Sequence, residues 1–170
     1  MIEINEYIGG KKMTIILEKM TSTDYENYLS FAIKDYAQDK ITAGTWNKEE
    51  AIELAAKSFK DLLPEGKDTN NDYLYSIKED KLDKKVGFLW VHLNKTPYES
   101  KFFIYDFVIF EEFRNLGFGK QSISCLTEKA KEMNVTQIDL HVFAHNKGAI
   151  HLYEQTGFVA TDISMSKQVR

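Results

Sequence analysis

Residues 114–120 read RNLGFGK, a stretch in which two alternating glycines lie between an arginine and a lysine. Glycines let a backbone approach a bound group closely, and the flanking cations favour a negatively charged group. The dinucleotide fingerprint requires a third glycine three residues after Gly119, where Ser122 stands. The nucleoside-triphosphate loop requires a glycine at the position of Arg114. Both nucleotide motifs are therefore absent.

The surrounding sequence places this stretch between a strand and a helix. The apolar run FFIYDFVIF at 102–110 predicts a strand, and apolar residues at helical spacing predict a helix over 119–133. Gly117 and Gly119 then lie at a helix N-terminus, where free N–H groups and a partial positive charge attract an anion such as a pyrophosphate. A tight turn without a ligand explains the same glycines equally well, so the turn alone leaves both interpretations open.

The rest of the chain alternates between strand and helix patterns. Strand-like runs lie at 14–18, 73–77, 86–93, 102–110, 137–143 and 158–165. Thr23 and Glu26 have the spacing of a capping box for a first helix, Asn47 with Glu50 is expected to cap a second, and Pro64 ends it. The order β-α-α-β-β-β-α-β-α-β predicts an α/β (α+β) fold, a mixed sheet with helices on both faces.

A second segment, HNKGAIHLYEQTGF at 145–158, follows the next predicted strand. Together with R-x-x-G-x-G at 114–119, it resembles the GCN5-related N-acetyltransferase (GNAT) superfamily. The resemblance covers Phe102 to about Met165, and the order of elements before it also fits that fold. It implies a single-domain GNAT-like protein with a mostly antiparallel sheet. It also implies an N-acetyltransferase that moves an acetyl group from acetyl-CoA to a primary amine of a small molecule, peptide or protein.

The resemblance also implies where acetyl-CoA binds. In this family the strand before the arginine splays from its neighbour, the acyl-pantetheine arm meets the exposed backbone, and the pyrophosphate lies on the N–H groups that follow. The matching cofactor-binding residues are Phe107, Val108, Ile109, Arg114, Asn115, Leu116, Gly117, Phe118, Gly119, Lys120 and Asn146. Two positions depart from the family pattern, since glycine is commoner at Asn115 and proline at Glu111. Neither departure removes a backbone N–H that binding requires.

Acetyl transfer from a thioester requires a neutral amine, stabilisation of the oxyanion and help for the departing thiolate. Tyr153 matches the family's tyrosine beside the thioester sulfur. A thiol with a pKa of ~8.5 is more acidic than a phenol with a pKa of ~10, so we expect Tyr153 to act chiefly as a hydrogen-bond donor. Packing in the core is the alternative for a helical tyrosine next to Leu152.

Two residues are candidates for the general base. His141 is predicted on the strand before 145–158, where related N-terminal acetyltransferases can carry a glutamate base, and an imidazole pKa near ~6.5 suits that task. Asp106 is the second candidate, because a carboxylate inside an apolar run needs a reason to be buried. Strand alternation is expected to place Asp106 on the face opposite Tyr105 and Phe107. A structural hydrogen bond remains the alternative for either candidate.

Other residues bear less directly on the chemistry. Trp46, Tyr73, Trp90 and Tyr105 are candidates for lining an acceptor pocket, although packing explains them as well. Residues 20–65 are expected to shape that pocket. The histidines have no convincing metal spacing with carboxylates, and the transfer needs no metal. Cys125, the only cysteine, has apolar neighbours at helical spacing and is interpreted as an inert packed thiol.

Length and composition bound the remaining possibilities. With 170 residues, 28% charged residues and a net charge of -4, the chain suits one globular domain without an overall attraction for nucleic acid or acidic membrane. We expect a cytoplasmic protein with a leader or extension at 1–12 and the N-acetyltransferase domain at 13–170. A homodimer, in which the final strand pairs between subunits, stays open. A catalytically silent acyl-CoA-binding regulatory protein is the alternative function.

Overall fold

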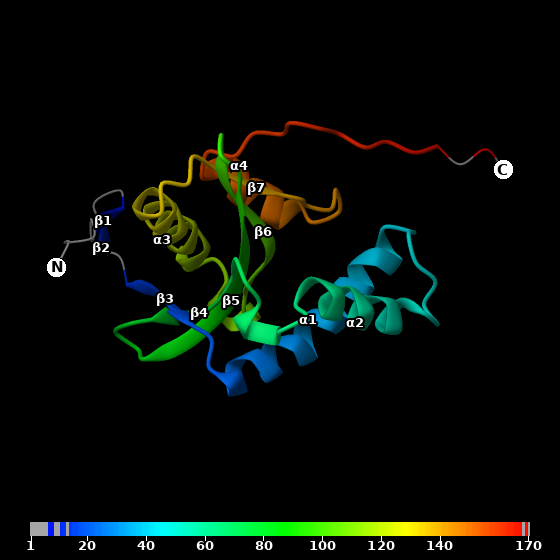
Figure 1. The fold of residues 1–170 in the computed structure, drawn as a ribbon, viewed down its shortest axis with the longest axis horizontal. Helices are drawn as coiled ribbons and strands as arrows, with labels where there is room; N and C mark the ends of the chain where they lie inside the picture. Colours follow the sequence, from blue (N-terminus) through cyan, green and yellow to red (C-terminus); the bar gives the residue numbers. More distant parts are fainter. Residues whose placement is uncertain (1–6, 9–10, 13, 168, 170) are drawn as a thin grey trace.

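The computed structural model describes residues 7–8, 11–12, 14–167 and 169 (Figure 1). Its helices and strands are β1 (Tyr7–Ile8), β2 (Lys11–Lys12), β3 (Ile15–Lys19), α1 (Ser22–Thr42), α2 (Ala51–Leu62), β4 (Asp72–Glu79), β5 (Lys84–Lys95), β6 (Ser100–Ile109), α3 (Phe118–Glu132), β7 (Gln137–Leu140) and α4 (Lys147–Gln155). Of the predicted leader at 1–12, only the short β1–β2 pair belongs to the described residues.

Strands β3 to β7 form one sheet whose spatial order, β3-β4-β5-β6-β7, equals the order along the chain. Neighbouring strands are antiparallel except β6 and β7, which are parallel. A parallel pair requires a crossover connection, and α3 lies in the connection between β6 and β7. The predicted mixed, mostly antiparallel sheet is confirmed.

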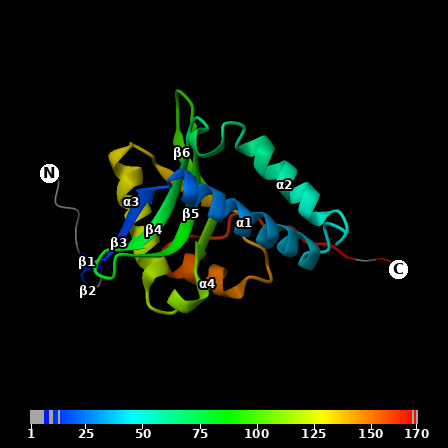
Figure 2. The ribbon, with the colours of Figure 1, turned by 90° about the horizontal axis from the view of Figure 1, so that it is seen from below.

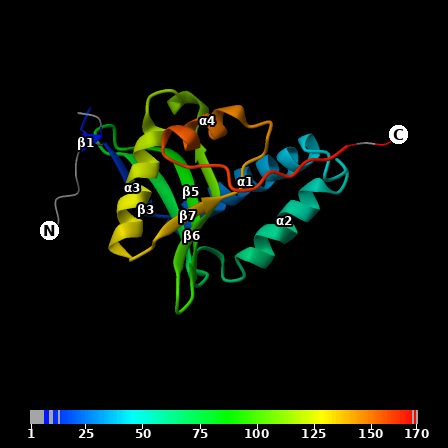
Figure 3. The same ribbon diagram turned by 90° about the horizontal axis from the view of Figure 1, so that it is seen from above.

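The sheet separates two apolar layers. Ile77 and Leu89 pack in the layer that includes α3, whereas Leu74, Phe88 and Trp90 pack in the layer that includes α1 and α2. Figures 2 and 3 view the molecule from opposite sides, with α1 and α2 on one side of the sheet and α3 and α4 on the other. Successive residues of a strand point to opposite faces, so the same strands supply both layers. The predicted placement of helices on both faces is confirmed.

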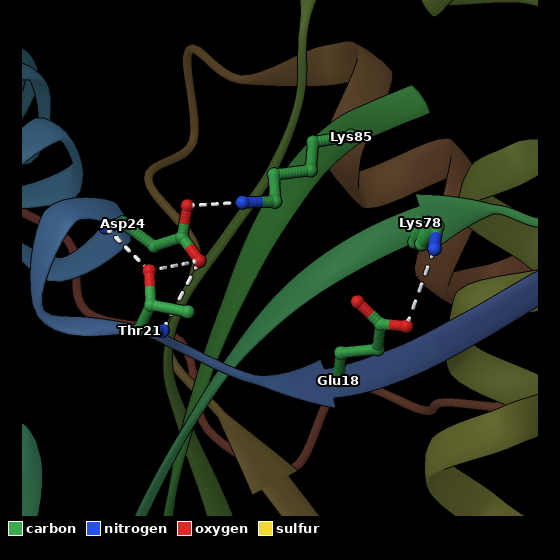
Figure 4. A network of polar contacts seen from close by, with 5 residues as sticks. All are labelled: Glu18, Thr21, Asp24, Lys78 and Lys85. Atoms are coloured by element: carbon green, nitrogen blue, oxygen red, sulfur yellow. Dashed lines mark hydrogen bonds and ion pairs between the residues drawn. The ribbon is translucent and has the colours of Figure 1, made fainter. Parts of the chain in front are cut away.

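The first helix is capped at a different position from the one predicted. Thr21, rather than Thr23, is its N-cap: the Thr21 hydroxyl accepts from the Asp24 amide at 3.1 Å, and the Asp24 carboxylate accepts from the Thr21 amide at 3.1 Å. Asp24 also forms an ion pair with Lys85, which joins the start of α1 to β5 (Figure 4). Close by, Lys78 of β4 reaches Glu18 of β3 at 3.5 Å. The Asp24–Lys85 pair therefore helps to fix where α1 crosses the sheet.

The second helix begins later than its predicted cap. Its N-cap is Glu50, which makes no capping hydrogen bond through its side chain, and Asn47 contributes only its backbone carbonyl, which accepts from the Ala51 amide at 3.1 Å. The helix ends at Leu62, before Pro64, as predicted. None of the helices in the described chain has the length and apolar character needed to cross a membrane.

A bulge in β6 changes which side chains share a face. Trp90 pairs with Asp106 and Val91 pairs with Ile104, so Tyr105 is an extra residue without a cross-strand partner. The Tyr105 ring stacks on Trp90, with 4.6 Å between the ring centroids. Tyr105 therefore lies on the same side of the sheet as Asp106, and the alternation predicted for these two residues is wrong.

Two predicted strands differ in the structure. The strand expected at 137–143 ends at Leu140, and residues 158–165, expected to form the last strand, are extended without strand pairing. This segment runs away from the sheet (Figure 1), and Val159, Ile163 and Met165 are each at least 80% exposed. Its alternating sequence has the right local pattern, but a strand also needs a neighbouring edge.

Gly87 is expected to control the stability of the β5–β6 pair. It lies opposite Ile109, and a Cβ atom at Gly87 would overlap the carbonyl oxygen of Val108, a backbone atom that moves only if β6 moves. We expect Gly87→Ala to lower the free energy of unfolding by roughly 2 kcal/mol or more, as overpacking in a rigid site does. Urea denaturation followed by circular dichroism measures this change.

Gly148→Ala is the matched control. An added Cβ at Gly148 meets no atom within 4 Å, and the position lies in the first turn of α4. We expect this variant to be as stable as the parent or slightly more stable, because alanine favours a helix over glycine by about 1 kcal/mol. Equal stability of the two variants would contradict the steric argument at Gly87.

Candidate active site

A cleft of about 330 Å³ is lined by α1, α2, β6 and the segment from His141 to Tyr153. All three residues predicted to be catalytic, Asp106, His141 and Tyr153, line it. Two of the predicted cofactor-binding residues, Phe107 and Asn146, line it as well. The fold therefore brings residues from separate parts of the chain into one solvent-accessible space.

The cleft lies where β6 and β7 separate. They pair only over Lys101–Ile104 and Gln137–Leu140, although β6 continues to Ile109. From Asp106 onward, β6 is paired with β5 on one side and has no strand on the other within the described chain. The predicted residues 107–109 belong to this part. A strand edge of this kind can hydrogen-bond an extended chain that carries amide groups.

Asp106 is held by a hydrogen bond from α1. The hydroxyl of Tyr28, a fully buried residue of α1, donates to Asp106 Oδ2 at 2.9 Å. Burial raises the pKa of Asp106 to about 6, and the carboxylate of Asp35 adds to the rise, while the Tyr28 hydrogen bond opposes it. A carboxylate with this pKa exchanges protons near neutral pH, which suits a general base.

Tyr153 faces the cleft from α4 with little exposure to solvent. Its ring is 9% exposed and packs against Phe107 and Phe158, with ring centroids at 6.5 and 5.4 Å. Burial, followed by the nearby Asp106 carboxylate, raises the pKa of the Tyr153 hydroxyl above its ordinary value. The hydroxyl therefore stays protonated at neutral pH and can donate a hydrogen bond.

His141 occupies a different environment from the one predicted. It follows the end of β7 at Leu140 and lies in a loop, exposed to solvent, with its ring edge-to-face against Phe143 at 5.2 Å. It makes no hydrogen bond to another described residue, whereas Asp106 is fixed by Tyr28. Its location on a strand was predicted wrongly, because the strand pattern continued past the last residue that pairs with β6.

The stretch RNLGFGK forms the predicted turn into a helix. Gly117 is the N-cap of α3 with φ +86°, and Asn115 has φ +62°, so both adopt left-handed backbone conformations. Asparagine tolerates this region better than most residues, which explains how Asn115 replaces a glycine here. Arg114 Nε donates to the Ile109 carbonyl at 3.0 Å and ties the turn to the end of β6.

Gly119 has a packing role that its sequence position did not reveal. A Cβ atom there would lie 3.0 Å from Leu152 Cδ2, so glycine lets the start of α3 approach α4 closely. By contrast, an added Cβ at Gly117 would meet no atom within 4 Å, and Leu116, Gly117 and Lys120 are exposed. The exposed N-terminus of α3 is compatible with a bound pyrophosphate.

Asn146 combines two roles. It is the N-cap of α4, and its Oδ1 accepts from the Ala149 amide at 3.2 Å. Its side-chain amino group makes no hydrogen bond to another described residue and can donate to a group bound in the cleft.

One cleft wall is held together by contacts that the sequence did not indicate. His145 Nε2 lies 2.8 Å from Asp39 Oδ1, and Lys40 Nζ lies over the rings of Tyr36, Trp46 and Phe143 at 5.3, 5.4 and 5.6 Å. Cation–π contacts of this kind contribute about 0.5–1 kcal/mol each at exposed sites. Together they join the end of α1 to the loop that carries His141.

Sequence reasoning missed the contribution of α1 to the cleft. Tyr28 was not singled out within the first predicted helix, and neither were Asp35 and Asp39, which line the cleft. Their spacing of seven and eleven residues from Tyr28 places all three on one helical face, which is the signal that could have found them. This part of α1 lies within 20–65, the range expected to shape the acceptor pocket.

The aromatic candidates separate into one cleft residue and three that pack elsewhere. Tyr105 lines the cleft. Trp90 is 2% exposed in the core, Tyr73 packs against Tyr75 and Phe102, and Trp46 contacts Tyr36.

Cys125 fits its interpretation as an inert thiol. Burial raises its pKa to about 11, so the thiolate is scarce at neutral pH, and its Sγ donates to the Ile15 carbonyl at 3.2 Å. Among the residues that the structure describes, no group of three or more His, Cys, Asp or Glu side chains is placed to hold a metal ion.

The chain resembles known proteins in sequence and in fold. The sequence model of the acetyltransferase (GNAT) family matches residues 31–158. The uncharacterized N-acetyltransferase YycN of Bacillus subtilis (strain 168) is 43% identical over 157 residues, which cover 92% of this chain and 100% of YycN. The uncharacterized N-acetyltransferase YdgE of the same organism is 34% identical, covering 92% of this chain and 99% of YdgE. The crystal structure of YycN superposes with a TM-score of 0.88, at 42% identity, over 92% of this chain and 99% of that one.

Asp106 is expected to destabilise the folded protein above acidic pH. Its folded pKa of about 6 exceeds the ordinary 3.8, so the folded state binds the proton more tightly, and stability falls as pH rises from about 4 through 6. We expect Asp106→Asn to be more stable than the parent at pH 8 by on the order of 1–3 kcal/mol. The two proteins should differ less at pH 4.5, and urea denaturation at both values measures this difference. A stability difference between the two proteins that does not change with pH would contradict the raised pKa of Asp106.

Proposed function

Because the chain belongs to the acetyltransferase (GNAT) family, we propose that it transfers an acetyl group from acetyl-CoA to a primary amine of a small molecule or peptide. The observation that carries this proposal is the cleft in which Asp106 and Tyr153 meet the unpaired part of β6. The cleft supplies a backbone edge for the acetyl donor, and beside it Asp106 can accept a proton and Tyr153 can donate one.

The residues around the cleft fit acetyl-CoA. The edge of residues 107–109, which has no neighbouring strand on this side, would hold the amide-containing arm, although the Ile109 carbonyl already accepts from Arg114. The exposed N-terminus of α3, flanked by Arg114 and Lys120, would hold the pyrophosphate. Asn146 would donate to the arm through its side-chain amino group. When bound, acetyl-CoA supplies the thioester carbonyl that the amine attacks.

Asp106 is the favoured general base. As the amine nitrogen bonds to the carbonyl carbon, it becomes acidic, and Asp106 accepts its proton directly or through one water. The Tyr28 hydrogen bond keeps one carboxylate oxygen in place and leaves the other for this task. His141 is the second candidate for the base, since it lines the same cleft but lacks a partner that would orient it.

Tyr153 serves the leaving group in this proposal. Its protonated hydroxyl donates a hydrogen bond to the sulfur as negative charge develops there, and protonation of the sulfur completes late. The raised pKa of Tyr153 makes an early, full proton transfer unfavourable, because a thiolate of pKa ~8.5 is a weaker base than this phenolate. A catalytically silent acyl-CoA-binding regulator is the alternative, and it predicts binding without turnover.

Replacing Tyr153 by phenylalanine tests the proposal. We expect Tyr153→Phe to reduce kcat about 10²-fold, the usual contribution of a positioned proton donor, while the Kd for acetyl-CoA stays within about twofold. Free-thiol release measures turnover over a panel of polyamines, amino acids, aminoglycosides and peptides, and calorimetry measures cofactor binding. Binding without turnover on any acceptor would support the regulator, and failure to bind acetyl-CoA would refute both functions.

The pH dependence identifies the base. We expect log(kcat/KM) for the parent protein to fall more steeply below about pH 6, where Asp106 becomes protonated, than above it. In Asp106→Asn this break should disappear and kcat/KM at pH 7 should drop about 10²-fold. His141→Ala is the matched comparison and should keep the break. If His141→Ala removes the break and Asp106→Asn keeps it, the base is His141.

A further inference from the structure

The cleft is rich in carboxylates. Asp35, Asp39 and Asp106 line it, and no lysine or arginine is among its lining residues in the described chain. The three carboxylates affect one another: Asp35 and Asp39 both raise the pKa of Asp106, and Asp39 raises that of Asp35. A space lined by several like charges favours a bound group of the opposite charge.

Two of the carboxylates follow each other along α1. Asp35 and Asp39 come seven and eleven residues after Tyr28, the partner of Asp106, which corresponds to a rise of about 10 and 16 Å between the backbones. They are thus the distal carboxylates, carried by later turns of α1 than Tyr28, whereas Asp106 lies on β6 and lines the same cleft as Tyr153. Both remain close enough to Asp106 to raise its pKa.

The two distal carboxylates are not equivalent. Asp39 Oδ1 lies 2.8 Å from His145 Nε2. Asp35, by contrast, is exposed and has no hydrogen-bond or ion-pair partner in the described structure. Arg114 lowers the pKa of Asp35, so it is close enough to offset part of the negative charge. Asp35 therefore offers the more accessible carboxylate.

Aromatic side chains also line the cleft. Tyr36 and Phe59 come from the helical side, Phe103 and Tyr105 from β6, and Phe143 from the loop. Ring faces attract cations and also cover methylene groups. A hydrophobic spacer between two ammonium groups suits such a lining.

We propose that the acceptor is a linear polyamine-type molecule, with at least two protonated amines joined by an aliphatic spacer. One amine reacts between Asp106 and Tyr153, and the other binds at Asp35 and Asp39. This inference rests on the proposed function, since it names the acceptor class of the same cleft.

The test compares diamines with monoamines of equal chain length, from 1,4-diaminobutane with butylamine to 1,8-diaminooctane with octylamine. Calorimetric titration into the protein saturated with CoA measures binding without turnover. We expect at least one diamine to bind about 10-fold more tightly than its monoamine. In Asp35→Asn this ratio should fall about fivefold, and in Asp35→Asn/Asp39→Asn it should approach one.

Asp61→Asn is the matched control, because Asp61 is an exposed carboxylate of α2 that does not line the cleft. This variant should keep the parent ratio between diamine and monoamine. Raising the salt concentration should reduce the diamine advantage, as screening requires. Equal binding of diamines and monoamines by the parent, or an equal loss in Asp35→Asn and Asp61→Asn, would overturn the inference.

The outcomes separate this inference from the proposed function. Acetyl-CoA turnover on amines without a diamine advantage would refute the acceptor class and keep the acetyltransferase. Selective diamine binding that depends on Asp35, without turnover, would support the acceptor class and refute the catalytic assignment.

Discussion

The backbone of β6 has to pair with two neighbours that diverge. Along β5 it is paired up to Ile109, which requires glycine at position 87, whereas along β7 the pairing stops at Ile104. Beyond that point the Ile109 carbonyl accepts from Arg114 Nε, and outward peptide groups without a protein partner are left for a ligand or water. The same strand is thus rigid on one side and open on the other. The bulge at Tyr105 lies at this boundary, and the side chain of the next residue, Asp106, contacts Tyr28 of α1.

Asp106 shows that this site lowers the stability of the folded protein. A partly buried carboxylate beside other carboxylates is costly to ionise, and the hydrogen bond from Tyr28 compensates only part of that cost, since the pKa remains raised to about 6. A residue chosen for stability alone would be neutral. The same conflict places the pKa of Asp106 in the range where a base works at neutral pH. Burial, and after it the Asp106 carboxylate, raises the pKa of Tyr153, so its hydroxyl stays protonated. In the proposed function, their environments therefore suit Asp106 to accept a proton and Tyr153 to donate one.

Local patterns in the sequence predicted most of the fold. The turn at RNLGFGK, the order of elements, the mixed sheet and its covered faces followed from periodicity, glycine chemistry and a family resemblance. The bulge at Tyr105 and the missing pairing of 158–165 could not be predicted, because each depends on what the rest of the chain presents to that segment. The cap at Thr21 is local, but Thr21 with Asp24 has the same spacing as Thr23 with Glu26, and the ion pair that joins Asp24 to Lys85 is not visible in the sequence. For the site, the sequence indicated Asp106, His141 and Tyr153 as separate candidates, and the structure places all three in one cleft. Their α1 partners were missed, since only tertiary packing places Tyr28 against β6.

Helix α1 contributes both to the core and to the cleft. Tyr28 and Ala32 pack in the core under 3% exposure, while Asp35 and Asp39, further along the helix, line the open part of the cleft. The buried turns fix the helix on the sheet together with the Asp24–Lys85 pair, whereas the later turns line the open part of the cleft. In the proposed function, the chemistry depends on β6 and α4, which the rest of the fold constrains. Recognition of the acceptor would depend on the exposed Asp35, where a change of charge costs the fold little but alters the pKa of Asp106.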